Sequence, residues 1–313
     1  TKVHARSSEG AERVVPLRHP GRWIAALLIV IALVAATRSA VANSAFEWGT
    51  VGHYLFSRTV LDGLVLTLEL TALAMVIGVV GGVVLAVMRL SPNPLISGAS
   101  WVYIWFFRGT PVLLQIYFWF YLSSLYPTIS FGIPFGPTFF HASANSLITK
   151  LAAGALALGL NEAAYMGEIV RAGILSVDRG QTEAASSLGL TSMTTMRRIV
   201  LPQAMRVIIP PLGNETISML KTTSLVSVIA LADLLDTVQQ IYTANFKIIP
   251  LLVVAALLYL MVTSVLYVGQ FFLERRFARG TVARTSALQQ LWRAVRIGHS
   301  PIPPGLLSAE RRR

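Results

Sequence analysis

Long runs of apolar residues, separated by short polar stretches, set the pattern of this chain. Six of the runs are long enough to cross about 30 Å of hydrocarbon as helices that rise about 1.5 Å per residue. They cover residues 22–43, 58–88, 96–125, 146–173, 199–229 and 248–273. The pattern predicts an all-α, polytopic membrane helix bundle with six spans. Residues 58–273 would form a five-helix core, and residues 22–43 would add one N-terminal span.

The composition supports a membrane protein and narrows the possible chemistry. Of the 313 residues, 54% are hydrophobic and 13% are charged, whereas a soluble domain carries about 25% charged residues. The chain has no cysteine, which excludes disulfides, zinc–thiolate sites and cysteine nucleophiles. Its five histidines are scattered along the chain, so no metal site is predicted.

The distribution of basic residues predicts the topology. Residues 126–145 and 231–246 contain no Lys or Arg, whereas residues 171–198 contain four arginines. Because loops rich in Lys and Arg stay in the cytoplasm, the first two loops are expected outside and the third inside. Both basic ends, residues 1–21 and 274–313, are then cytoplasmic. Such a tail could also bind nucleic acid, but the topological explanation accounts for every loop, and no nucleic-acid partner is predicted.

Each end of the chain fits two structural interpretations. The basic start, the apolar run and Ala40-Val41-Ala42 together also fit a cleavable signal peptide, although a retained helix is the favoured prediction. In the tail, apolar residues recur at helical spacing between positions 288 and 295, which fits a helix lying on the inner leaflet. A disordered basic tail fits the tail equally well.

Three internal segments carry predictions about packing and loops. Gly78 and Gly82 lie four residues apart, and such small-residue faces allow close approach of two helices. Residues 132–145 are rich in Gly, Pro and Phe and predict an ordered external loop without a strand. Residues 231–244 predict a short, amphipathic external helix.

Residues 178–189 have the signals of a short helix in the third loop. Asp178 is a good N-cap residue, and Gln181 three positions later can reach back as in a capping box. Gly189 is a natural helix end. The signals predict a cytoplasmic helix of two to three turns. Three side chains are expected on a shared side of it, those of Ala184, Ala185 and Leu188.

The residues of this loop carry a family resemblance. The spacing of Glu183-Ala184-Ala185, Gly189 and Ile199-Val200-Leu201-Pro202 resembles the EAA loop of ABC importer permeases. The resemblance implies that residues 179–189 form the coupling helix, which docks on a separate ATP-hydrolysing subunit. The residues that it assigns to this contact are Arg179, Glu183, Ala184, Ala185, Leu188 and Gly189.

Further motifs extend the resemblance over residues 61–272. Arg108-Gly109-Thr110-Pro111 with Gln115 is similar to the third-span signature of the polar amino-acid uptake permeases. The resemblance implies a type I ABC importer transmembrane domain in a bacterial inner membrane. The implied partners are a second permease copy or homologue, two ATPase subunits, an extracytoplasmic solute-binding protein and membrane lipid. ATP and Mg would bind to the partner ATPase, and no cofactor is expected on this chain.

Polar residues inside the apolar spans are costly and are therefore candidates for function. Glu168 and Arg171 are three residues apart and are expected to form a structural ion pair. Glu162 has no local partner, so it could receive the ammonium group of a substrate, or form a salt bridge with Lys221 or a partner subunit. The candidate residues of a substrate path are Gln115, Asn161, Glu162, Tyr165, Asn214, Glu215 and Lys221.

Prolines in the fifth span predict irregular backbone. A helix is expected to start near position 191 or 192 and to bend at Pro202. Pro210, Pro211 and Gly213 are then expected to break it, opening a cavity beside Asn214.

These observations favour one function over its alternatives. The chain is expected to be the permease subunit of an ATP-driven importer of polar amino acids or similar small solutes, working by alternating access. The alternative is a secondary amino acid transporter driven by an ion gradient, with Glu162 and Glu215 as ion sites. The sequence contains no P-loop and no hydrolase motif, so no catalytic residue is predicted and the chain is expected not to be an enzyme.

Overall fold

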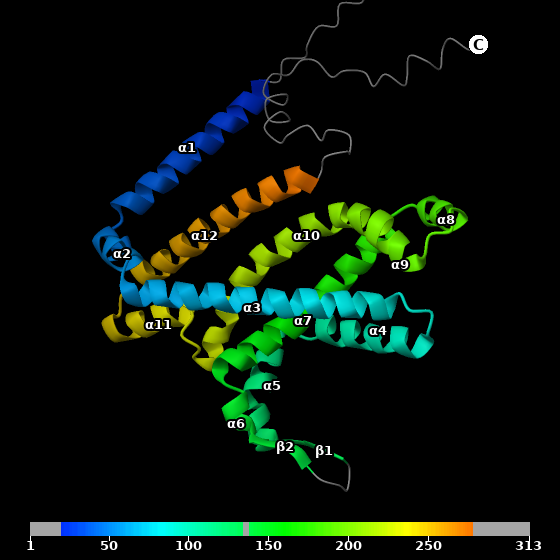
Figure 1. The fold of residues 1–313 in the computed structure, drawn as a ribbon. Helices are drawn as coiled ribbons and strands as arrows, with labels where there is room; N and C mark the ends of the chain where they lie inside the picture. Colours follow the sequence, from blue (N-terminus) through cyan, green and yellow to red (C-terminus); the bar gives the residue numbers. More distant parts are fainter. Residues whose placement is uncertain (1–19, 134–137, 278–313) are drawn as a thin grey trace, which may run out of the picture. The chain divides into compact units, whose positions relative to one another are not determined.

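The computed structural model describes residues 20–133 and 138–277 (Figure 1). The predictions for residues 1–19 and for the tail from residue 278, including the amphipathic helix at 288–295, lie outside the described residues. Contacts divide the chain into two compact units, residues 1–42 with 280–313 and residues 43–279. In the first unit the structure describes α1 (Pro20–Ala42), a helix of 23 residues that is apolar enough to cross a membrane.

The second unit is built almost entirely from helices (Figure 1). Its first half runs through η1 (Ser44–Phe46), α2 (Trp48–Leu55), α3 (Arg58–Arg89), α4 (Pro94–Gly109), α5 (Val112–Leu125), β1 (Thr128–Gly132), β2 (Thr138–Ser143) and α6 (Ala144–Leu147). Its second half runs through α7 (Lys150–Leu175), α8 (Arg179–Ser187), α9 (Ser192–Thr195), η2 (Met196–Val200), α10 (Leu201–Thr222), η3 (Thr223–Ile229), α11 (Leu234–Asn245) and α12 (Ile248–Phe277).

The contact between α3 and α7 forms the centre of this unit (Figure 1). Gly78 and Gly82 are both buried in it, which confirms the packing face expected from their spacing. Around them, fully buried Leu70, Leu158 and Met166 belong to the largest apolar cluster of the described residues. The two helices therefore approach closely because Gly78 and Gly82 have no side chains where α7 lies against them.

All six predicted spans are helical, but not all of them are single continuous helices. Three described helices, α1, α3 and α12, meet the length and hydropathy expected of a span, and a bent pair of helices covering Ser192–Ile229 and Leu234–Asn245 would be a fourth. The third predicted span is two shorter helices, α4 and α5, because Thr110 and Pro111 are extended. Proline disfavours helical backbone in the residue before it, which explains why the helix stops at Thr110.

The predicted break in the fifth span is wrong. The helix α10 continues through Pro210 and Pro211, and the irregular turns lie on either side of it, as a π-helix over Met196–Val200 and a 3₁₀-helix over Thr223–Ile229. Each proline removes one backbone donor, but membrane helices tolerate that loss when neighbouring groups compensate. The expected start near position 191 is confirmed, since Thr191 caps the N-terminus of α9.

The segment after α5 is the second correction. An ordered loop without a strand was expected, but β1 and β2 pair as an antiparallel hairpin, with Thr128 opposite Ser143 and Gly132 opposite Thr138. Both strands contain Thr and Phe, and β1 also contains Ile, residues that favour extended backbone, and this preference prevails over the loop character of the Gly and Pro residues between them. The short helix expected at 231–244 is confirmed by α11, whose N-cap is Asp233.

A polar clasp joins the segment that precedes α2 to the start of α12. Lys247 Nζ lies 2.6 Å from Glu47 Oε2, and it also donates to Thr50 Oγ1 at 3.1 Å. The hydrogen bond from Lys247 lowers the pKa of the Glu47 carboxyl, and the hydroxyl of Thr50 acts in the same direction. The clasp is exposed, so it holds these segments together only weakly.

Candidate functional site

Local hydrogen bonds define α8 at both of its ends. The carboxylate of Asp178 accepts a hydrogen bond from Gly180 N at 2.7 Å, which confirms the predicted cap. At the other end Gly189 has φ +75°, and the amide of Leu190 donates to Ala185 O at 3.1 Å. With the bond from Gly189 N to Ser186 O at 3.0 Å, this is a Schellman motif, which requires left-handed backbone at the glycine.

The exposed face of α8 differs from the predicted one in a single residue. Ala184 is exposed and Leu188 is 79% exposed, but Ala185 is only 2% exposed. At about 100° per residue Ala185 lies about 100° from Ala184 and about 60° from Leu188, at the border of the face that packs on α9 and the π-helical turn. The outer surface is therefore a small apolar knob of Ala184 and Leu188, beside exposed Glu183.

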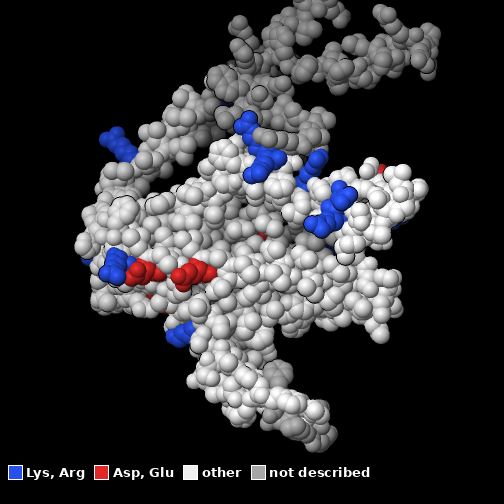
Figure 2. Space-filling view, viewed as in Figure 1, with Lys and Arg blue, Asp and Glu red and all other residues white. Residues whose placement is uncertain are grey.

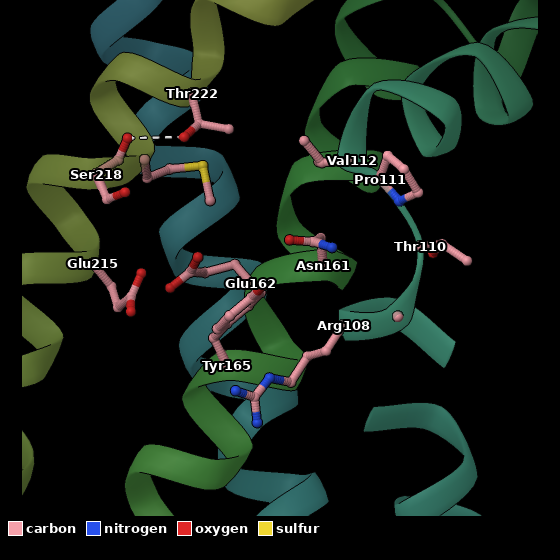
Figure 3. A pocket seen from close by; sticks show the side chains of 12 residues that line it. Arg108, Thr110, Pro111, Val112, Asn161, Glu162, Tyr165, Glu215, Ser218 and Thr222 are labelled. Atoms are coloured by element: carbon pink, nitrogen blue, oxygen red, sulfur yellow. Dashed lines mark hydrogen bonds between the residues drawn. The ribbon is translucent and has the colours of Figure 1, made fainter. Parts of the chain in front are cut away.

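A cavity of about 550 Å³ lies between the α4–α5 break, α7 and α10 (Figure 3). Its volume is within the range of small-molecule sites. The residues that line it are Arg108, Gly109, Thr110, Pro111, Val112, Asn161, Glu162, Tyr165, Glu215, Ser218, Met219 and Thr222. Three segments that are about 50 residues apart in the sequence thus meet at one place.

Two amide side chains hold the α4–α5 break in position. Asn161 Nδ2 donates to Phe107 O at 2.8 Å, and Gln115 Nε2 donates to the same carbonyl at 3.0 Å and to Thr110 Oγ1 at 2.8 Å. The break leaves carbonyl groups without helical donors, and inside a membrane such groups need internal partners. The amides supply these partners and thereby keep the adjoining Arg108 on the wall of the cavity.

The charges of the cavity are two carboxylates and one guanidinium. Glu162 is 3% exposed, and its Oε1 atom is buried without a hydrogen-bond partner. Figure 3 shows Glu162 on α7 and Glu215 on α10 pointing toward the same space. The guanidinium carbon of Arg108 lies 5.0 Å from the centre of the Tyr165 ring, in cation–π geometry. A buried carboxylate oxygen without a partner is costly, so this cavity is suited to a ligand that carries positive charge.

The structure brings together only part of the predicted substrate path. Asn161, Glu162, Tyr165 and Glu215 line the cavity. The three others lie outside its lining: Gln115 bonds to the α4–α5 break, Asn214 accepts from Gln270 Nε2 at 3.0 Å, and Lys221 is exposed.

The two predictions of ion pairs have opposite outcomes. Glu168 and Arg171 pair at 2.7 Å on the same helix, which confirms the predicted structural pair. The alternative pair of Glu162 with Lys221 does not form, because in the described part of the chain the salt bridges are Glu168–Arg171 and Glu47–Lys247. Among residues 20–133 and 138–277, Glu162 therefore has no salt-bridge partner.

Sequence reasoning missed four polar residues of the cavity, namely Arg108, Thr110, Ser218 and Thr222. Arg108 had a usable signal, because it is a basic residue inside an apolar run, immediately before a Gly-Thr-Pro break. The hydroxyl residues had none, since Ser and Thr are common in membrane helices. Across residues 20–133 and 138–277, no three His, Asp or Glu residues form a group that could hold a metal ion.

Comparison with known proteins yields one family and several relatives. The family described as "Binding-protein-dependent transport system inner membrane component" matches residues 78–279. The arginine transport system permease protein ArgU of Corynebacterium glutamicum is 48% identical over 276 residues, which is 88% of this chain and 85% of ArgU. The L-cystine transport system permease protein TcyB of Bacillus subtilis is 36% identical over 238 residues, which is 76% of this chain and 94% of TcyB.

Two solved structures are similar in fold. A chain from the crystal structure of an amino acid ABC transporter with histidines matches 70% of this chain and 94% of its own length, with a TM-score of 0.60 and 36% identity. A chain of the inward-facing MetNI methionine ABC transporter matches 72% of this chain and 97% of its own length, with a TM-score of 0.56. At 17% identity, the second match concerns the fold alone.

Proposed function

This chain belongs to the family of binding-protein-dependent transport system inner membrane components, and we propose that it imports an amino acid with a cationic side chain. Membership makes it a multi-pass inner-membrane permease subunit of an ABC transport system. The family works with ATPase subunits and a solute-binding protein, so the chain is a transport subunit and not an enzyme. The proposal concerns the solute, the orientation of the chain and the way in which the cavity and α8 are used.

The charges of the cavity support the choice of solute. An amino acid with a cationic side chain carries two positive groups and one carboxylate at neutral pH. The cavity offers the complement, namely Glu162 and Glu215 for the two cations and Arg108 for the carboxylate. The buried Oε1 of Glu162, which has no partner, is the single observation that carries the proposal. The name of the 48% identical relative, an arginine transport permease, agrees with this choice.

The proposed route connects the cavity to ATP hydrolysis through α8. The apolar knob of Ala184 and Leu188 would seat on an ATPase subunit, and its movement would rock the helices that line the cavity. The assembly would contain two permease chains and two ATPase subunits, with ATP and Mg bound by the latter. The solute-binding protein would release its solute into the cavity from the opposite side.

Basic residues support the proposed orientation. On the face shown in Figure 2, Lys and Arg side chains gather over the end of the second unit that carries α8, and the surface between the two ends is largely uncharged. Described residues at that end include Arg179, Arg197 and Arg198. By the positive-inside rule this end would be cytoplasmic, which puts both termini in the cytoplasm.

The test compares two Glu→Gln variants of the complete transporter in proteoliposomes, with saturating solute-loaded binding protein and ATP. Glu162→Gln should lower arginine uptake by about 10- to 100-fold, since a hydrogen bond to a charged group contributes about 1.5–3 kcal/mol. Glu69→Gln is the matched control, because Glu69 is an exposed residue of α3 that does not line the cavity. The control should stay within about twofold of the unaltered protein.

Two results would contradict the proposal. Unchanged arginine uptake by Glu162→Gln would show that the carboxylate of Glu162 is not needed for transport. Uptake in vesicles that lack the ATPase, driven by an ion gradient, would favour secondary transport instead.

A further inference from the structure

We propose that Gly78 is a positioning residue for Glu162, and that the absence of a side chain at this place in α3 determines how the carboxylate projects into the cavity. The inference rests on the proposed role of Glu162 in binding the solute. Gly78 itself does not line the cavity, so its effect would act through Glu162. Nothing in the sequence links these two residues, which are 84 positions apart.

The contact between Gly78 and Glu162 leaves no room for a methyl group. A Cβ atom added to Gly78 would lie 2.5 Å from Glu162 Cγ, 2.8 Å from Glu162 Cβ and 3.5 Å from its backbone carbonyl carbon. Carbon atoms pack at about 3.5–4.0 Å, so the two side chains would have to separate by roughly 1 Å. The crowding therefore involves the first two carbons of the glutamate and not its flexible end.

The position of the crowded atoms decides what must move. A different rotamer can carry Cγ away from α3, but it also moves the carboxylate that Cγ carries. Cβ is fixed to the backbone of α7, so relief at that atom requires the helices to shift. A binding group must be held within about 0.5 Å of its productive place, and either response exceeds that tolerance. Gly78 therefore affects the place of the carboxylate as well as the packing of the two helices.

Gly81 offers a matched comparison on the same helix face. A Cβ atom added to Gly81 would lie 2.9 Å from Ala163 Cβ, so an alanine there also crowds the α3–α7 contact. Ala163 does not line the cavity, although it is the neighbour of Glu162 in sequence. A Gly→Ala change at position 81 thus tests general crowding between the helices without touching the glutamate side chain.

The first experiment measures transport kinetics of the complete transporter, in proteoliposomes with ATPase subunits and binding protein. With saturating solute-loaded binding protein, Gly78→Ala should lower the rate of arginine uptake about tenfold, as expected when a group that receives the solute in the cavity is displaced. Gly81→Ala should stay within about twofold. Equal effects of the two variants, or an unchanged rate in Gly78→Ala, would overturn the inference.

A double-mutant cycle links the effect of Gly78 to the glutamate side chain. In Glu162→Gly both crowded atoms, Cβ and Cγ, are absent, so adding Gly78→Ala to that background should change the remaining transport by no more than about twofold. If Gly78→Ala alone prevents assembly of the complex, the double variant should restore assembly. The same fold-change in both backgrounds, or no restored assembly, would show that Gly78 acts only on helix packing.

A labelling experiment reads the position of the side chain without using transport. The chain has no cysteine, so Glu162→Cys introduces a single thiol on this subunit, with its sulfur at the place of the crowded Cγ. A cationic methanethiosulfonate reagent should label this thiol at a rate that Gly78→Ala changes at least about fivefold and Gly81→Ala does not. An unchanged rate would refute the positioning role. If transport by Glu162→Gln is normal but the labelling rate changes, the proposed function fails and the positioning role stands.

Discussion

The helix α8, which we propose couples the chain to an ATPase subunit, and the cavity at Glu162 are built in opposite ways. All the groups that define α8 lie within residues 178–190, and each acts on backbone a few positions away. The cavity combines residues from Arg108 to Thr222, and its carboxylate is placed by contacts with other helices. The first region can therefore be predicted from a short sequence pattern, whereas the second exists only when the α4–α5 break, α7 and α10 are packed together.

The difference has a consequence for sensitivity to mutation. A local motif is lost when a substitution prevents one backbone conformation that it requires, and the rest of the bundle need not change. A cavity made of several helices fails when any packed surface around it moves. Substitutions of equal size should therefore have separable effects in the two regions, and the following tests run from the largest expected effect to the smallest.

Replacing Gly189 by Val tests the local construction of α8. Gly189 has open space around it, so the only obstacle is its left-handed backbone, φ +75°, which costs a β-branched residue more than about 1–2 kcal/mol. We expect arginine uptake to fall more than about tenfold while the complex still assembles. Gly98→Ala is the control, because it also has open space but ordinary helical backbone, and its uptake should be normal. Full uptake by Gly189→Val would mean that the end of α8 is not important for coupling.

Leu188→Glu tests whether the apolar knob of α8 docks on another subunit. The side chain is 79% exposed, so the substitution should not unfold the chain, but a central apolar contact of an interface contributes roughly 2 kcal/mol or more. We expect solute-stimulated ATP hydrolysis to fall about tenfold or more. Leu95→Glu, at a position that is 81% exposed on α4, is the matched control. If both variants behave alike, the knob is not the contact.

Asn161→Ala tests the amide support of the α4–α5 break. The loss of its bond leaves Phe107 O with Gln115 as its remaining side-chain donor, so the cost is that of one hydrogen bond, about 0.5–1.5 kcal/mol. We expect a lower melting temperature of the purified complex. Because both amides share one carbonyl, the Asn161→Ala and Gln115→Ala double variant should lose a different amount from the sum of the singles. Strict additivity would show that the two amides act independently.

Lys247→Met tests the exposed clasp and should have the smallest effect. The folded pKa of Glu47 is lowered by Lys247, so the clasp stabilises the protein above the ordinary pKa of about 4.5 and loses this contribution as the pH falls through the lowered value. We therefore expect the variant to melt slightly below the unaltered complex at pH 7, and the two melting temperatures to converge in acid. A difference that grows in acid would contradict this explanation.

Most of the helices could be predicted from the sequence, and the errors share one physical reason. The apolar runs correctly predicted the long helices, and Asp178 and Gly189 correctly predicted the two ends of α8. These signals act on lipid or on backbone nearby in the chain. The prolines at 210 and 211 and the strand-forming residues near 128–143 were misjudged. In these segments, local preferences compete, and the neighbouring helices or the opposite strand decide between them.

By itself, the sequence determined the membrane class, the long apolar helices, the helix α8 and its caps, because apolar runs and caps act through lipid and nearby backbone. Tertiary structure alone decided that Arg108 joins Glu162 and Glu215, that Lys221 does not, and that Ala185 turns inward. Only packing settles such facts, since the direction of a side chain in a bundle depends on which helices stand beside it. Gly78 is the clearest case, as its importance comes from the glutamate that lies against it and not from its own neighbours in the chain.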